Sequence, residues 1–534
     1  MRTRPRPRPQ HTLHLTPLTN QCPECGHTLW NAYEDERAIT TLDGVVRLVL
    51  QVQRCPNATC ARFHKPYRPE TEPHFALPHH EFGLDVIALV GHLRYVAHRS
   101  IPEMHAELRR RRVVVAERTV TNLLDRYDER RTVATANPKR LRARLRSQGR
   151  VVLAIDGLQP HVGHEILWVL RDCLSGELLL ARSLLSATIK DIAALIREVR
   201  QVLPVPIGAV VSDGQDTMRK AVARTLPGIP QQLCHFHYLR EAAQPMAAAD
   251  RHAKKELKKR VRGVRPIERV AEVAPPREAE IVRGYCAAVR AALTDDGLPP
   301  LAAAGLKLQA RLIWIVTSLE GVLDKAGGLP ASLMKLRKVL NKGLNDTASL
   351  WPPVKAAYQW VHRVARLLEN KKQWPARKLR RRLSQILTQM RQAARQTKDE
   401  AVREQLQNFV KVTKSYWTGL FRCYESIDIP RTNNDLEHLF GSYRYHERRA
   451  SGRKRASGGL VVKGAARILA EVATRERPEE GLGLPEGYVD AWQRSRAELE
   501  GRREARRQQG RFRRNPFSYL QKLEHLLLQL SLPS

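Results

Sequence analysis

The sequence predicts a multidomain α/β protein, and three observations support that class. Short apolar, β-prone runs alternate with helical periodicity over residues 150–240. Residues 241–425 keep helical periodicity almost throughout. Near the N-terminus, two pairs of cysteines flank a predicted β-hairpin. Together they predict a mixed-sheet core that is interrupted by an all-α insertion and preceded by a small metal-stabilised module.

The core begins with a block of alternating strands and helices. Strands are predicted at VVLAIDG (151–157), ILWVLRD (166–172) and ELLLARSL (177–184), followed by a helix over 188–203. The strand IGAVVSDG (207–214), a helix over 216–225 and the short run QQLCHFH (231–237) complete the block. Three strands, a helix, a strand, a helix and a strand is the order of a ribonuclease H-like domain. The order alone is weak evidence, because α/β patterns are common.

Two strand-terminal aspartates strengthen that interpretation. Asp156 ends the first strand and Asp213 ends the fourth, and each is followed by glycine. In this fold the two strands lie side by side, so the carboxylates would meet at one edge of the sheet. Two such carboxylates repel each other unless a hard cation such as Mg²⁺ lies between them. The alternative is that each Asp-Gly pair simply begins a turn.

A third carboxylate lies far downstream in RTNNDLEHLFGSYRYHERRASGRKR (431–455). Thr432, Asn433 and Asn434 are helix N-cap residue types, and apolar residues then recur at helical spacing. Glu437 falls in the first turns of this helix, where the helix dipole favours a carboxylate. The candidate metal ligands are therefore Asp156, Asp213 and Glu437, with Asp216 and Asp435 as nearby carboxylates that complicate the assignment.

These motifs resemble the bacterial insertion-sequence DDE transposases, near those related to the eukaryotic Mutator-like elements. The resemblance rests on Asp156 (AIDG), Asp213 (VSDG) and Glu437 (TNNDLE), with Cys234 and His237 of CHFH, and covers about residues 150–240 and 425–460. It implies a DNA transposase that cleaves and joins strands at transposon ends. The three carboxylates would hold Mg²⁺ or Mn²⁺ for in-line displacement at phosphorus. The partners would be terminal repeats, target DNA and at least a second copy of the chain.

Two other functions stay open. One is a transposase-derived, sequence-specific DNA-binding regulator without catalysis, and the other is a ribonuclease H-like nuclease or resolvase. Cys234 and His237 are also open: they are either accessory residues near the active site or a buried cysteine and a helix-capping histidine.

Composition favours a nucleic-acid partner. Lys and Arg number 92 against 54 acidic residues, for a net charge of +38. So large an excess disfavours compaction unless a polyanion neutralises it. No apolar stretch is long enough to span a membrane, and the start MRTRPRPRPQ lacks the apolar core of a signal peptide. We expect a soluble, cytoplasmic protein at the bacterial nucleoid.

The N-terminal cysteines predict a zinc ribbon. Cys22 and Cys25 form one pair and Cys55 and Cys60 the other, and the spacer alternates apolar and polar residues around Asp43-Gly44. Four thiolates on two turns joined by a hairpin are typical of a closed, structural Zn²⁺ site. The second pair is widely spaced, so His64 is an alternative ligand to Cys60.

Two further segments are predicted to contact DNA. Residues 84–130 are predicted to form three helices, the last two as a helix-turn-helix whose third helix enters the major groove. The alternative is a generic helical bundle. A basic stretch after Glu437 is expected to follow the DNA backbone. The candidate contacts are Arg118, Thr119, Thr121, Asn122, Arg444, Arg448, Arg449, Arg453, Lys454 and Arg455.

These predictions divide the chain into seven segments. They are a disordered basic tail (1–20), the zinc ribbon (21–70), the helix-turn-helix (82–131), the first part of the core (150–240), the all-α insertion (241–425), the second part of the core with the Glu437 helix (426–476) and a helical C-terminal tail (477–534).

Overall fold

The computed structural model describes residues 8–77, 79–135, 138–159, 165–185, 187–261, 264–270, 276–294, 300–452, 458–476, 488–521 and 523. They form a multidomain mixed α/β structure with two sheets. Two compact units divide the chain. Unit 1 contains residues 1–151, 155–206 and 435–534, and unit 2 contains 152–154 and 207–434. Each unit is described by itself.

The N-terminal sheet of unit 1 has the strand order β1-β3-β2, with β4 paired to β3. Its strands are β1 (His11–Leu15), β2 (Trp30–Thr41), β3 (Gly44–Arg54) and β4 (Pro66–Tyr67). The predicted hairpin is confirmed, since Thr41 pairs with Gly44 across a tight turn. The predicted disordered tail over 1–20 is wrong for His11–Leu15, which pairs in parallel with β3 and buries Leu15. Residues 1–7 lie outside the described residues.

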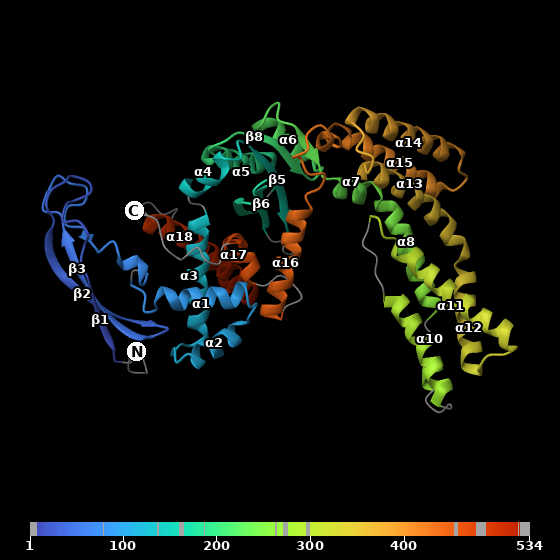
Figure 1. The fold of residues 1–534 in the computed structure, drawn as a ribbon, viewed down its shortest axis with the longest axis horizontal. Helices are drawn as coiled ribbons and strands as arrows, with labels where there is room; N and C mark the ends of the chain where they lie inside the picture. The colour runs from blue at the N-terminus through green and yellow to red at the C-terminus, as the bar shows by residue number, and fades with distance from the viewer. Residues whose placement is uncertain are drawn as a thin grey trace. The chain divides into compact units, whose positions relative to one another are not determined.

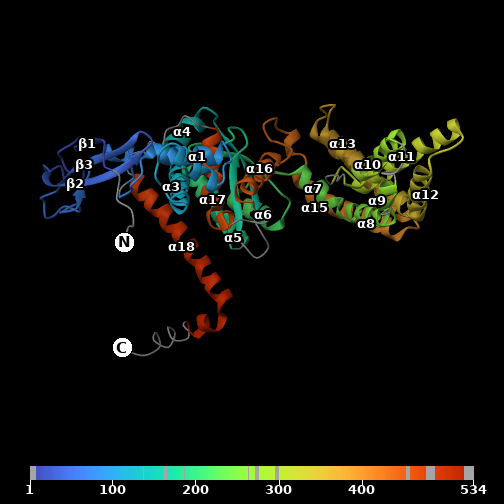
Figure 2. The same ribbon diagram turned by 90° about the horizontal axis from the view of Figure 1, so that it is seen from below.

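Unit 1 also contains helices from several parts of the chain. They are α1 (Leu84–Tyr95), α2 (Ile101–Arg110), α3 (Glu117–Thr135), α4 (Pro138–Arg146), α5 (Ile189–Val202), α16 (Asn434–Ser451, in this unit from Asp435), α17 (Gly458–Glu476) and α18 (Tyr488–Arg514). Ser100 and Glu103 form a capping box that starts α2. Figure 1 shows α1, α3 and α17 side by side, and their core includes Leu124, Ala470 and Trp492. In Figure 2, the C-terminal half of α18 projects away from these helices.

The second sheet has the strand order β7-β6-β5-β8-β9. Its strands are β5 (Val151–Leu158), β6 (Ile166–Asp172), β7 (Leu178–Leu184), β8 (Ile207–Ser212) and β9 (Gln231–Leu233). β5 is shared, because Val152–Ala154 belong to unit 2 and its remaining residues to unit 1. The first and fourth strands of the block are neighbours, as predicted. β6 and β7 are antiparallel, and β8 and β9 are parallel.

Helices make up the remainder of unit 2. They are α6 (Asp216–Thr225), α7 (His235–Ala242), α8 (Gln244–Arg260), α9 (Val264–Val270), α10 (Pro276–Thr294), α11 (Ala304–Ala326), α12 (Ala331–Asp346), α13 (Trp351–Glu369), α14 (Ala376–Gln396) and α15 (Glu400–Tyr416). Figure 1 shows α13, α14 and α15 side by side. Between the last strand and Glu437, the described residues form helices and no strand, as the helical periodicity predicted.

Among the described residues, no helix is both long enough and apolar enough to cross a membrane. Of the predicted helical C-terminal tail (477–534), residues 477–487, 522 and 524–534 lie outside the described residues.

Candidate metal centres and nucleic-acid contacts

Four cysteines of the N-terminal sheet converge at one point. Cys22 and Cys25 lie in the turn before β2, Cys55 follows β3, and Cys60 lies in the next turn; all four Sγ atoms are within 4.8 Å of one another. The Sγ atoms of Cys22 and Cys60 are 3.8 Å apart, and those of Cys25 and Cys55 are 3.6 Å apart. A tetrahedron with Zn–S bonds of about 2.3 Å has edges of about 3.8 Å. These separations are too long for a disulfide and fit a shared metal ion.

Backbone hydrogen bonds shape the two turns that carry these thiols. Gly26 has a φ of +72°, and its N–H donates to the carbonyl of Cys22 at 2.8 Å, which closes the first turn. In the second turn, the backbone N–H of Arg62 donates to Sγ of Cys60 at 3.3 Å. The backbone N–H of His27 lowers the pKa of Cys25 to about 6. A thiolate is therefore available near neutral pH, which metal binding requires. His64, the alternative to Cys60, is not a member of this cluster.

Asp156 and Glu437 come together within unit 1. Asp156 lies near the end of the buried strand β5, and its Oδ1 accepts the N–H of Gly157 at 2.8 Å. Glu437 lies in the first turn of α16 and is half-buried, while Asp156 is only 7% exposed. Carboxylate oxygens of the two residues lie within 4.8 Å of each other. The pair therefore offers two oxygen ligands, of the type that Mg²⁺ and Mn²⁺ prefer, on one side of a metal ion.

Asp213 and His237 belong to unit 2. Asp213 follows β8, and its carboxylate accepts the N–H of Gln215 at 3.2 Å. Burial raises the pKa of Asp213, and the nearby His237 acts in the opposite direction. His237 lies in the first turn of α7 and is 8% exposed. The two nearby carboxylates that complicate the assignment, Asp216 and Asp435, are both exposed, and Asp216 pairs with Lys220 at 2.6 Å.

The CHFH run holds the segment that leads into α16. Sγ of the fully buried Cys234 accepts the backbone N–H of Asn433 at 3.3 Å. The backbone N–H of His235 donates to the carbonyl of Arg431 at 3.0 Å. Arg431 and Asn433 lie just before Asn434, where α16 begins, so these contacts fix the backbone that enters the helix. Sequence reasoning missed His235 and Arg431, since partners almost 200 residues apart leave no local pattern.

The predicted DNA contacts differ in exposure. Arg118 and Asn122, at the N-terminal end of α3, are exposed, and Thr119 and Thr121 are half-buried. On α16, Arg444, Arg448 and Arg449 are exposed; Arg449 pairs with Glu103 at 3.1 Å. Arg453, Lys454 and Arg455 lie outside the described residues.

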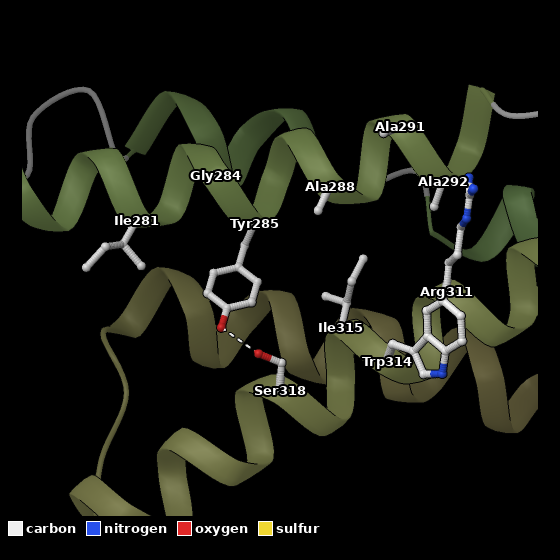
Figure 3. A pocket seen from close by; sticks show the side chains of 10 residues that line it. All are labelled: Ile281, Gly284, Tyr285, Ala288, Ala291, Ala292, Arg311, Trp314, Ile315 and Ser318. Atoms are coloured by element: carbon white, nitrogen blue, oxygen red, sulfur yellow. Dashed lines mark hydrogen bonds between the residues drawn. The ribbon is translucent and has the colours of Figure 1, made fainter.

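An apolar hollow of about 650 Å³ lies between α10 and α11 (Figure 3). Tyr285 points from α10 toward α11, where its hydroxyl hydrogen-bonds Ser318 at 2.9 Å. Arg311 is the one charged residue of its lining, and no carboxylate, histidine or cysteine takes part. Its lining offers no metal ligand of these kinds, and none of the predicted site residues lines it.

Comparison with models of known protein families and with curated proteins finds no match for this chain.

Proposed function

We propose that this protein is a DDE transposase that cleaves DNA strands and transfers them at transposon ends, with a catalytic core of the ribonuclease H-like type. The single observation that carries the proposal is the approach of the Asp156 and Glu437 carboxylates to within 4.8 Å, although 280 positions separate them in the chain. Two carboxylates this close repel each other, and a bound cation would relieve that repulsion. The neighbouring positions of β5 and β8 in the sheet also support the proposal.

We assign Asp156, Asp213 and Glu437 as the ligands of Mg²⁺ or Mn²⁺. Oxygen ligands on an octahedral Mg²⁺ are about 2.9–4.2 Å apart when each metal–oxygen distance is about 2.1 Å. The carboxylate oxygens of Asp156 and Glu437 lie within 4.8 Å of each other, which is compatible with that range. Bound metal ions would activate the attacking oxygen and stabilise the leaving one. His237 belongs to unit 2 and offers a ring nitrogen, whereas Mg²⁺ prefers oxygen, so we assign His237 to a contact with the DNA phosphate.

The remaining parts would bind DNA and support the core. We propose that the four-cysteine cluster is a structural Zn²⁺ site of the ribbon type. We also propose that α2 and α3 act as a helix-turn-helix, with Arg118 and Asn122 at the exposed start of α3 facing DNA. Paired transposon ends would require at least a dimer.

The test is a cleavage and joining assay on duplex DNA from the regions that flank the coding sequence, with Mg²⁺ or Mn²⁺. Asp156→Asn, Asp213→Asn and Glu437→Gln should each lower strand cleavage by more than about 100-fold. Loss of a residue that only supports a metal ligand lowers activity by at most about 100-fold, so a larger loss indicates a direct ligand. DNA binding should persist in all three. The matched control is Asp435→Asn, an exposed carboxylate in the same helical turn as Glu437, which should stay active.

Two outcomes would favour the alternatives. Sequence-specific binding of the flanking DNA without cleavage by the wild-type protein would favour the regulator. Cleavage that depends on the three carboxylates but never joins strands would favour the nuclease or resolvase.

A further inference from the structure

A basic hollow of about 520 Å³ lies where α13 turns into α14, entirely within unit 2. We name it the corner pocket. The residues of its lining that carry the argument are Arg363, Arg366, Lys371, Lys372, Trp374 and Arg382. Its volume lies in the range of sites that hold one small molecule, about 300–1,000 Å³.

The charges of the corner pocket favour an anion. Five cationic side chains line it against a single carboxylate, Glu369, which pairs with Lys371 at 3.2 Å. Within the described part of the chain, no carboxylate lies within ion-pair distance of the other four cations. Such uncompensated positive charge attracts phosphate groups.

An aromatic ring lies among these cations. Trp374 is half-buried against the apolar core of α13, α14 and α15, and its ring forms part of the pocket wall. Nζ of Lys378 lies 4.3 Å from the ring centroid, Nζ of Lys372 5.6 Å and Cζ of Arg382 5.8 Å. A ring and a guanidinium beside one another are suited to stacking on a nucleobase, while the cations bind its phosphate.

The loop that carries Trp374 is held in one conformation. Asn370 and Gln373 both have a φ of +49°, an unfavourable backbone region for residues other than glycine. The side-chain amide of Asn370 accepts the N–H of Trp374 at 2.8 Å and donates to its carbonyl at 2.9 Å. Arg431, which precedes α16, donates to the carbonyl of Glu369 at 2.6 Å. The ring is thus positioned before any ligand binds.

We propose that the corner pocket binds one unpaired nucleotide of DNA, with the base against Trp374 and the phosphate against Lys372 and Arg382. The inference rests on the proposed function for its ligand, DNA, and adds a place where a strand is held outside the duplex. A paired base is covered on both faces by its neighbours, so a ring inside a pocket reaches only a base that has left the stack.

The test measures binding of a fluorescent oligothymidylate and of a duplex of the same length to the full chain. Trp374→Ala should weaken binding of the single strand about 5- to 150-fold, the range for loss of one base–aromatic stack. Duplex binding should change less than about twofold. Arg382→Gln should weaken single-strand binding and reduce its salt dependence by about one phosphate contact.

Two variants separate loss of the site from loss of the fold. Trp374→Phe keeps an apolar ring and should retain most of the single-strand affinity. Trp314→Ala removes a tryptophan that is 69% exposed in the apolar hollow of the same unit, and should leave both affinities unchanged.

Equal losses for single strand and duplex in Trp374→Ala would overturn the proposal in favour of backbone contacts alone. Competition by polyglutamate as strong as that by the oligonucleotide would overturn it in favour of an acidic protein partner. If the wild-type protein binds neither DNA, the proposed function fails as well. If Trp374→Ala still cleaves DNA and binds the single strand as tightly as the wild-type protein does, the nucleotide pocket is overturned while the proposed function stands.

Discussion

Cys55 provides the sharpest test of the N-terminal metal site. Its Sγ lies 3.6 Å from that of Cys25, and the residue is 1% exposed. A serine hydroxyl is a poor Zn²⁺ ligand, so Cys55→Ser should reduce bound zinc from about one equivalent per chain to almost none. The ribbon should then unfold and become sensitive to proteases over 21–70. Metal analysis and limited proteolysis check both results.

Cys286→Ser is the matched control for that experiment, because Cys286 is fully buried in the apolar core of unit 2 and is not a member of the four-cysteine cluster. It should leave the zinc content unchanged. Full zinc retention by Cys55→Ser, or equal loss in both variants, would contradict the assignment.

Gly214 is required by packing rather than by backbone conformation. A Cβ at this position would lie 1.9 Å from Cζ of Tyr416. Tyr416 cannot easily move, because it is 2% exposed and its hydroxyl donates to Glu241 at 2.6 Å. Gly214→Ala should therefore lower the free energy of unfolding by about 1–3 kcal/mol. Urea denaturation measures this loss.

Gly284→Ala offers the opposite expectation in the same unit. Gly284 lies inside α10, and an added Cβ meets nothing within 4 Å. Alanine should stabilise that helix by about 0.5–1 kcal/mol. A Gly214→Ala protein as stable as Gly284→Ala would refute the packing argument.

At the scale of the helix, α7 begins on a histidine that must stay neutral. His235 is 5% exposed, and its Nε2–H donates to the carbonyl of Leu420 at 2.8 Å. Burial lowers the pKa of His235 to about 4, and the charge of Arg431 acts in the same direction. The unfolded chain, with a histidine pKa of about 6.5, binds this proton more readily than the native state. Stability is therefore complete above about pH 6.5 and is lost as the pH falls toward 4.

His235→Gln should flatten this dependence. Glutamine can donate to the Leu420 carbonyl but takes up no proton in this range. The stability lost between about pH 6.5 and pH 4 should be smaller than in the wild-type protein by about 3 kcal/mol. Urea midpoints across that range measure the difference. The control is His252→Gln, at an exposed position of α8, which should show the same pH dependence of stability as the wild-type protein. The same dependence in His235→Gln would contradict the role assigned to His235.

Most secondary-structure elements could be predicted because their signals are local. Periodicity places the strands of 151–233 and the helices α10 to α15, and Asp43-Gly44 places the hairpin. β1 was missed because HTLHL follows a run of Arg-Pro pairs, and its pairing with β3 is set by tertiary contacts. The spacing of the four N-terminal cysteines along the chain likewise predicted that they form one cluster. The contact of Cys234 with Asn433 depends instead on a fold that local patterns do not encode.

Over unit 1 as a whole, buried charges join helices from opposite ends of the chain. Nη2 of Arg94 in α1 lies 2.5 Å from the Glu447 carboxylate in α16. Arg467 of α17 lies 3.3 Å from Glu447 and 3.5 Å from Asp128 of α3. All four side chains are less than 10% exposed. The predicted helix-turn-helix is therefore not packed as a separate module.

Because these ion pairs are buried, removing one partner leaves an uncompensated charge inside the protein. Glu447→Ala should therefore destabilise unit 1 by about 3–5 kcal/mol. The loss should appear in hydrogen exchange as the same decrease in protection for α1, α3 and α17, since a cooperative unit opens together. The exposed pairs of Glu504 with Arg507 and Arg511 provide the control, and Glu504→Ala should leave the free energy of unfolding almost unchanged. Faster exchange confined to α16 in Glu447→Ala would show instead that the two ends of the chain fold independently, and that the helices of 82–131 can bind DNA as a module of their own.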